Sequence, residues 1–147
     1  MSFTEQFTEV NQVGGELYPA LKTVAAHTGA WLPLSNHQRA IFIVMVGAMT
    51  TLATLDFSVQ QASDSSGTGV KAITSKAITQ LTAAGGDGND LVCVEVRSEE
   101  LDVSNGFEYV RGLLTVGTAT VYCCLLPIRF IPNYPPVSTS AWTEIVP

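Results

Sequence analysis

The sequence TLATLDFSVQQASDSSGTGVKAI, residues 51–73, contains the pattern that decides the fold. Leu55, Phe57 and Val59 alternate with polar residues, and successive side chains of a strand point to opposite faces. We therefore predict a strand with one buried and one solvated face. Residues 62–69, ASDSSGTG, follow it, and such a cluster of small polar residues and glycine is typical of a turn.

Strands of this kind recur along the chain between short polar turns. The longest is expected at residues 107–116, where Gly112 and Leu114 share one face. The pair Gly117-Thr118 predicts a tight turn that returns residues 119–126 as the antiparallel partner of this strand.

Residues 40–48, AIFIVMVGA, form the most apolar run of the chain. The run is rich in β-branched residues, which predicts a strand covered on both faces. We expect residues 47–50 to join it to the strand at 55–60 as a hairpin. A membrane helix needs about 20 apolar residues, so the run is too short for one and we expect no membrane partner.

About seven to nine such strands and no long helix predict an all-β protein, an antiparallel β-sandwich with jelly-roll-like connections. We expect an N-terminal arm at residues 1–20 and a sandwich domain at residues 21–127. Residues 128–147 are rich in proline and predict an extended C-terminal tail.

The composition limits the possible partners. The net charge is −6, the isoelectric point is about 4.7 and the seven basic residues are scattered, so we expect no nucleic-acid binding. Charged residues make up 14% of the chain, against roughly 25% in typical soluble domains, and mean hydropathy is +0.27. Such a chain hides part of its surface in an oligomer or larger assembly, or else has a dense β core.

The polar motifs suggest no catalysis. The three cysteines lie in apolar strand patterns, so we expect them to be small buried side chains. Free cysteines of this kind also indicate a protein that is made and folded in a reducing cytoplasm. No G-x-S-x-G, C-x-x-C or H-x₃-H spacing accompanies His27 and His37, so we predict no enzyme, metal or cofactor.

One segment resembles a calcium-binding repeat. Residues 85–92, GGDGNDLV, fit the nonapeptide G-G-x-G-x-D-x-U, in which Asp90 and backbone carbonyls would offer oxygen ligands. That motif works by stacking of successive repeats, and this chain has one copy. We therefore predict a loop between two strands, with calcium binding as the alternative.

Several aromatic residues lie outside the regular strand patterns. Trp31, Tyr134 and Trp142 are each either a core residue under a loop or an interface anchor, because Trp and Tyr are enriched where proteins bind one another. The candidate interface residues are Phe3, Phe7, Trp31, Tyr134 and Trp142.

Three segments resemble the capsid cement or decoration proteins of tailed bacteriophages. They are LDFSVQQASDSSGTGVKAIT (55–74), VCVEVRSEELDVSNGFEYVRGLLTVG (92–117) and ATVYCCLLPIRFIP (119–132). The shared patterns are Q-x-A-x-D-x-x-G-T-G followed by K-A-I-T, and E-V-x-x-x-x-L-D-x-x-x-G-F-x-Y-V-R. None of these patterns is catalytic.

The resemblance implies a structural virion protein on the outer surface of an expanded icosahedral capsid. Its partners would be the major capsid protein, whose subunits it would bridge, and further copies of itself as a homodimer or homotrimer. It would be made in the cytoplasm of the bacterial host. The alternative is a carbohydrate-binding or adhesion module of a phage tail or fibre, which predicts Trp31 or Trp142 exposed on a face of the sandwich.

Overall fold

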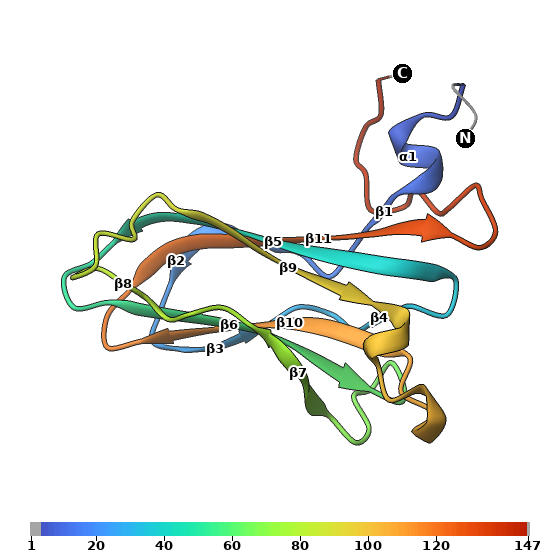
Figure 1. Ribbon diagram of the computed structural model, residues 1–147. Helices are drawn as coiled ribbons and strands as arrows, with labels where there is room; N and C mark the ends of the chain where they lie inside the picture. Colours follow the sequence, from blue (N-terminus) through green and yellow to red (C-terminus); the bar gives the residue numbers. More distant parts are fainter. Residues whose placement is uncertain (1–3, 147) are drawn as a thin grey trace.

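The computed structural model describes residues 4–146, which fold into two antiparallel sheets packed face to face (Figure 1). Sheet A comprises β1 (Gln12–Val13), β2 (Leu17–Lys22), β5 (His37–Met49), β9 (Leu91–Arg97) and β11 (Val121–Pro132). Sheet B comprises β3 (Ala25–Thr28), β4 (Leu32–Pro33), β6 (Thr54–Ala62), β7 (Lys71–Ala77), β8 (Leu81–Thr82) and β10 (Tyr109–Gly117). The helical turns are α1 (Phe7–Val10), η1 (Ser98–Glu100) and η2 (Val103–Asn105).

The strand order is that of a jelly roll. Sheet A runs β2–β11–β5–β9 and sheet B runs β3–β10–β6–β7, with β1 beside β2 on β11, β4 beside β3 on β10, and β8 beside β7 on β6. The chain crosses between the sheets after β2, β4, β5, β8, β9 and β10. Two Greek keys wound in this way define the jelly roll. The prediction of an all-β, jelly-roll-like sandwich is confirmed.

The two predicted hairpins are wrong. β5 and β6 lie in opposite sheets, and so do β10 and β11, so each short connection is an arch over the end of the sandwich. The rings of Phe42 in β5 and Phe57 in β6 meet across the core with centroids 6.2 Å apart. Each arch places the apolar faces of two consecutive strands opposite each other across the core.

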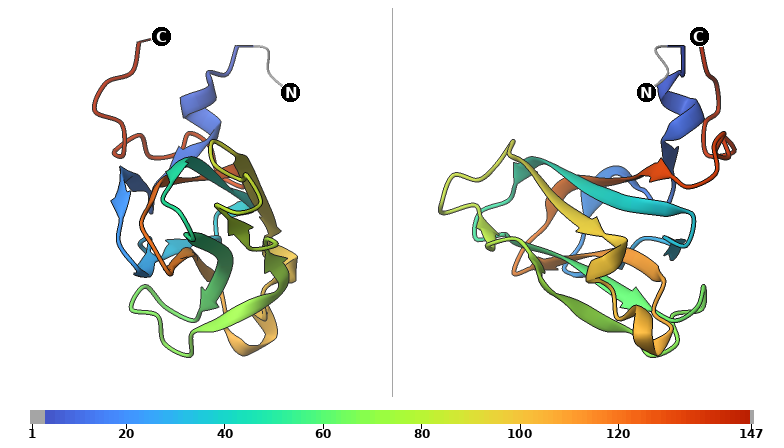
Figure 2. Two further views of the ribbon diagram at one scale, coloured as in Figure 1. Left: turned by 90° about the vertical axis from the view of Figure 1, so that its left-hand side faces the viewer. Right: turned by 45° about the vertical axis from the view of Figure 1, so that its right-hand side comes forward.

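The core lies between the sheets and follows the alternation of the sequence. Leu55, Phe57 and Val59 of β6 are fully buried, and Gly112 and Leu114 of β10 share the buried face of their strand, as predicted. The two layers are seen from other sides in Figure 2.

The strands pass beyond the expected limits of the sandwich domain. β2 begins at Leu17, inside the expected N-terminal arm, and β11 continues to Pro132, inside the expected tail. Among residues 4–146, no helix is both long and apolar enough to span a membrane.

Candidate interaction surfaces

The loop that resembles a calcium repeat connects β8 to β9. The backbone amide of Thr82 donates a hydrogen bond of 2.7 Å to Oδ2 of Asp87, and Gly86 takes a left-handed φ of +83°. The Asp87 carboxylate therefore holds the turn. Within residues 4–146, no group of three or more His, Cys, Asp and Glu side chains could hold a metal ion.

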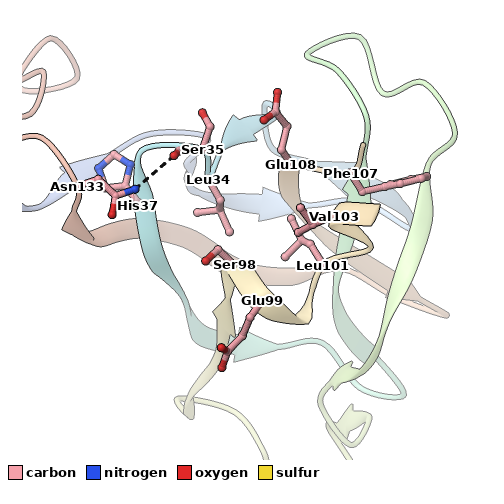
Figure 3. Close-up of a pocket in the computed structure, with 10 residues that line it drawn as sticks. All are labelled: Leu34, Ser35, His37, Ser98, Glu99, Leu101, Val103, Phe107, Glu108 and Asn133. Carbon is pink, nitrogen blue, oxygen red and sulfur yellow. Dashed lines mark hydrogen bonds between the residues drawn. The ribbon is translucent and has the colours of Figure 1, made fainter. Parts of the chain in front are cut away.

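A pocket of about 270 Å³ lies between the start of β5 and the two 3₁₀ turns (Figure 3). Its apolar walls come from Leu34, Leu101, Val103 and Phe107. Its polar residues include Ser98, Glu99 and Glu108, and Nδ2 of Asn133 donates to the carbonyl of Ser35 at one side. Glu99 and Glu108 extend in opposite directions in Figure 3, so the pocket does not pair two carboxylates.

His37 lines this pocket but is only 3% exposed. Neither of its ring nitrogens has a hydrogen-bond partner among the described residues. Burial, and then the positive charge of Arg129, lower the pKa of His37 to about 4. Arg129 is itself buried and donates from Nη1 to the carbonyl of Pro33 over 3.0 Å. A histidine kept neutral in this way is a core residue rather than a proton donor at ordinary pH.

The two ends of the chain form one projection, which we call the terminal lobe (residues 4–13 and 133–146). It rises from the outer side of sheet A, beside the end of β11 (Figure 1). Its halves are joined by a hydrogen bond of 2.9 Å from the amide of Val137 to the carbonyl of Glu9, and Val137 is buried. β1 pairs with β11 and attaches the lobe to the sandwich.

Three of the predicted interface residues lie on the terminal lobe. Phe7, Tyr134 and Trp142 are all exposed there, together with Ile145 and Val146. Phe3 lies outside the described residues. These residues lie far apart in the sequence, and the structure joins the two chain ends that carry them.

Trp31 lies elsewhere, against the outer side of sheet B. Cζ of Arg111 is 4.4 Å from the centroid of its ring, and Nε of Arg111 donates to Oε1 of Gln60 over 2.9 Å. A Cβ atom on Gly67 would lie 2.6 Å from Nε1 of Trp31, so the loop at 62–69 packs directly on the indole. Trp31 therefore packs between the Arg111 side chain and this loop, and it is partly exposed rather than part of the core.

The outer face of sheet A carries an apolar surface that the sequence analysis did not single out as a site. Cross-strand pairs place Leu126, Ile43 and Cys93 in one row, and Cys124, Met45 and Leu91 in the next. Tyr122 pairs with Leu21 on the same face. We call these eight residues the sheet A face: Leu21, Ile43, Met45, Leu91, Cys93, Tyr122, Cys124 and Leu126.

The outer face of sheet B is polar by comparison. Its cross-strand pairs include Arg111 with Gln60 and Thr115 with Asp56. On sheet A, Met45 is 55% exposed and Leu91 is 68% exposed. A shallow hollow of about 370 Å³ lies at the same end, around Gly47. The sandwich thus has one solvated and one apolar outer surface.

Comparisons with known proteins give only distant likenesses. No family model matches the sequence, and no curated protein sequence matches it significantly. The fold is similar to a chain in the structure of Triatoma virus, with a TM-score of 0.47 and 12% identity over 94% of this chain and 74% of that one. It is also similar to a chain in the structure of broad bean stain virus, with a TM-score of 0.44 and 10% identity over 99% of this chain and 97% of that one.

Proposed function

We propose that this chain is a capsid cement protein of a tailed bacteriophage. It binds the outer surface of the expanded capsid and stabilises it by bridging major capsid subunits. The observation that carries the proposal is the terminal lobe, which joins both chain ends and carries exposed Phe7, Tyr134 and Trp142. The sequence patterns at 55–74 and 92–117, which resemble cement proteins, support it.

The mechanism is binding without chemistry. A ligand that binds only one state of its partner stabilises that state by mass action, here the expanded lattice. Exposed aromatic side chains on a projection suit this task, because Trp and Tyr supply large contact areas with few rotatable bonds. The many equivalent sites of an icosahedral shell multiply a modest affinity at each site.

The alternative function, a carbohydrate-binding module, predicts a solvent-exposed indole ring on a face of the sandwich. Trp31 has the Arg111 guanidinium on its ring and the 62–69 loop against its edge. Trp142 lies on the terminal lobe rather than on a sheet. The structure thus offers no specific observation in favour of this alternative.

The test is co-sedimentation of the full chain with empty capsids of its phage, expanded and unexpanded. We expect stoichiometric pelleting with expanded capsids alone. Tyr134→Ala should weaken pelleting, whereas Tyr18→Ala should not, since Tyr134 and Tyr18 are similarly exposed at 79% and 72% but only Tyr134 lies on the lobe. Absence of pelleting with both capsid forms, from folded protein, would overturn the proposal and place glycan binding first.

A further inference from the structure

We propose that the pocket beside η1 and η2 binds a small monocarboxylate with an apolar body. The carboxylate accepts a hydrogen bond from the ring of His37 and is stabilised by the charge of Arg129. This inference is independent of the proposed function, because it concerns the interior of a pocket and needs no capsid.

The first observation is the charge of Arg129. Its side chain follows Leu125 and Pro127 on the buried side of β11 and is only 6% exposed. Nη1 donates to the carbonyl of Pro33, whereas Nε is buried without a hydrogen-bond partner among residues 4–146. The four ion pairs of these residues do not include Arg129. A buried charge is costly unless an opposite charge pairs with it, so Arg129 favours an anion close to it.

The second observation is the ring of His37, which lines the pocket although the residue is only 3% exposed. Neither ring nitrogen has a hydrogen-bond partner within the described part of the chain. The neutral ring carries one N–H donor, and because both nitrogens are unpartnered this donor is free in either tautomer. A buried donor without an acceptor is costly, so an oxygen atom of a ligand would be well bound at this ring.

The charge of Arg129 favours a negatively charged oxygen atom at the ring of His37. This charge is the second cause, after burial, of the lowered pKa of His37, so its field reaches the ring. A carboxylate bound to His37 lies in the same field, in a buried region where charges interact strongly. A hydrogen bond to a carboxylate is also stronger than one to a neutral oxygen atom. A cation at this position would instead be repelled by Arg129.

The walls and the volume of the pocket select the rest of the ligand. Four apolar side chains form the walls, namely Leu34, Leu101, Val103 and Phe107. The volume of about 270 Å³ corresponds to about nine water molecules of about 30 Å³ each. A ligand of about eight to ten non-hydrogen atoms therefore fits, and hexanoate and benzoate are of this size.

Two acidic residues of the pocket limit the ligand to one carboxylate. Glu99 and Glu108 lie on opposite sides of the apolar walls in Figure 3, and both are exposed. Water and salt screen exposed charges, and Glu99 also pairs with Arg97 at 3.4 Å, so these residues do not prevent a monoanion from entering. A second carboxylate on the ligand would remain beside them and be repelled. We therefore expect adipate, the dicarboxylate of the same chain length, to bind more weakly than hexanoate.

Titration of the full chain with hexanoate at neutral pH and constant ionic strength, followed by ¹H–¹⁵N NMR spectra, tests the site. We expect shifts of the His37 ring nitrogens and of the amides of residues 98–108, with a dissociation constant of about 1 mM. Hexan-1-ol lacks the charge and should bind at least about tenfold more weakly, and hexylammonium should not bind. A pocket that holds only water would show no shifts at about 20 mM hexanoate, and that result or equal binding of hexan-1-ol would overturn the proposal.

Two pairs of variants locate the bound carboxylate. Arg129→Met removes the buried charge and should weaken hexanoate binding at least about tenfold, whereas Arg111→Met, on the outer side of sheet B, should leave it unchanged. Val103→Asp adds a carboxylate to an exposed wall and should weaken binding at least about threefold by repulsion. Val24→Asp is its control, since Val103 and Val24 are 60% and 54% exposed but only Val103 lines the pocket. Thermal denaturation confirms that each variant is folded, and unchanged affinity in Arg129→Met or Val103→Asp, or equal weakening by the controls, would contradict a carboxylate bound at this site.

Discussion

The amide of Val137 donates a hydrogen bond of 2.9 Å to the carbonyl of Glu9 and so connects the two ends of the chain. The side chain of Val137 is 8% exposed, although the tail around it is almost entirely open to solvent. α1 has only four residues, and an isolated helix of that length is not stable in water. The tail therefore helps to hold α1 in place, together with the contacts of α1 with β11.

Val137→Asp should disrupt the terminal lobe without unfolding the sandwich. A buried aspartate without a partner separates the tail from α1, whereas the core between the sheets is untouched. We expect fast hydrogen exchange at the amides of α1, an unchanged denaturation midpoint, and loss of binding to expanded capsids. Val146→Asp makes the same substitution at an 83% exposed position of the tail and should leave α1 protected. Continued protection of α1 in Val137→Asp would show that the tail does not hold the helix.

His37 should make the protein less stable in acid. Its folded-state pKa of about 4 lies below its ordinary value of 6.5, so the unfolded chain binds this proton more readily between those values. Stability is therefore lost as the pH falls from 6.5 towards 4, by about 3 kcal/mol for this group alone.

Urea unfolding of His37→Gln at pH 7 and below pH 4 measures this contribution as a difference from the unmodified chain. The loss of stability between these two pH values should be smaller in His37→Gln by about 3 kcal/mol, because glutamine takes up no proton. His27→Gln is the control, since the His27 ring lies on β3 and contacts the carbonyl of Thr23 at 3.0 Å. If the two variants lose stability equally in acid, the buried histidine is not responsible.

The alternating residues of the sequence predicted which face of each strand is buried, and did not predict which strand lies beside it. Leu55 and Phe57 were correctly expected in the core, because alternation is a local property. The partners of β6 and β10 were missed, since a short connection such as Gly117-Thr118 serves equally well as a hairpin or as an arch between sheets. Sheet order depends on contacts between distant segments, which one sequence does not reveal.

The candidate surfaces were likewise predictable only where they depend on local sequence patterns. Tyr134 and Trp142 stood out because they lie outside strand patterns, and both are on the lobe. The docking of the tail on α1 was not foreseeable, because it depends on a backbone hydrogen bond and on one small apolar residue, Val137. The sheet A face had a signal in the apolar run at 40–48, which predicted cover on both sides of β5. The sequence did not reveal that the chain itself covers only the inward face of β5 and leaves the outward face exposed.

Gly112→Ala should destabilise the core. A Cβ atom there would lie 2.5 Å from Cδ2 of Leu125 and 2.9 Å from Cε2 of Phe57, both of which are packed between the sheets. Overpacking of this kind costs about 1 to 3 kcal/mol, measured by chemical denaturation. Gly88→Ala, whose Cβ would meet the carbonyl oxygen of Gly47 at 3.6 Å, should change stability by less than about 0.5 kcal/mol. Equal effects from both substitutions would contradict this account of the core.

The packing of the 62–69 loop on Trp31 can be measured with two glycines that share one backbone conformation. Gly67 has φ of +88° and Gly86 has φ of +83°, so alanine is strained at both positions, by about 1 kcal/mol. A Cβ atom on Gly86 meets nothing within 4 Å, whereas one on Gly67 would lie 2.6 Å from Nε1 of Trp31. Gly67→Ala should therefore cost about 1 to 3 kcal/mol more than Gly86→Ala in chemical denaturation.

Combining each substitution with Trp31→Ala completes this test. Removing the indole should erase the extra cost at Gly67 and leave the cost at Gly86 unchanged, because only the first depends on the contact. An extra cost at Gly67 that persists without Trp31 would mean that the loop is held by the hydrogen bonds around Asp64, whose carboxylate accepts from the amides of Ser66 and Thr68. Loss of the extra cost would instead establish that Trp31 anchors this loop.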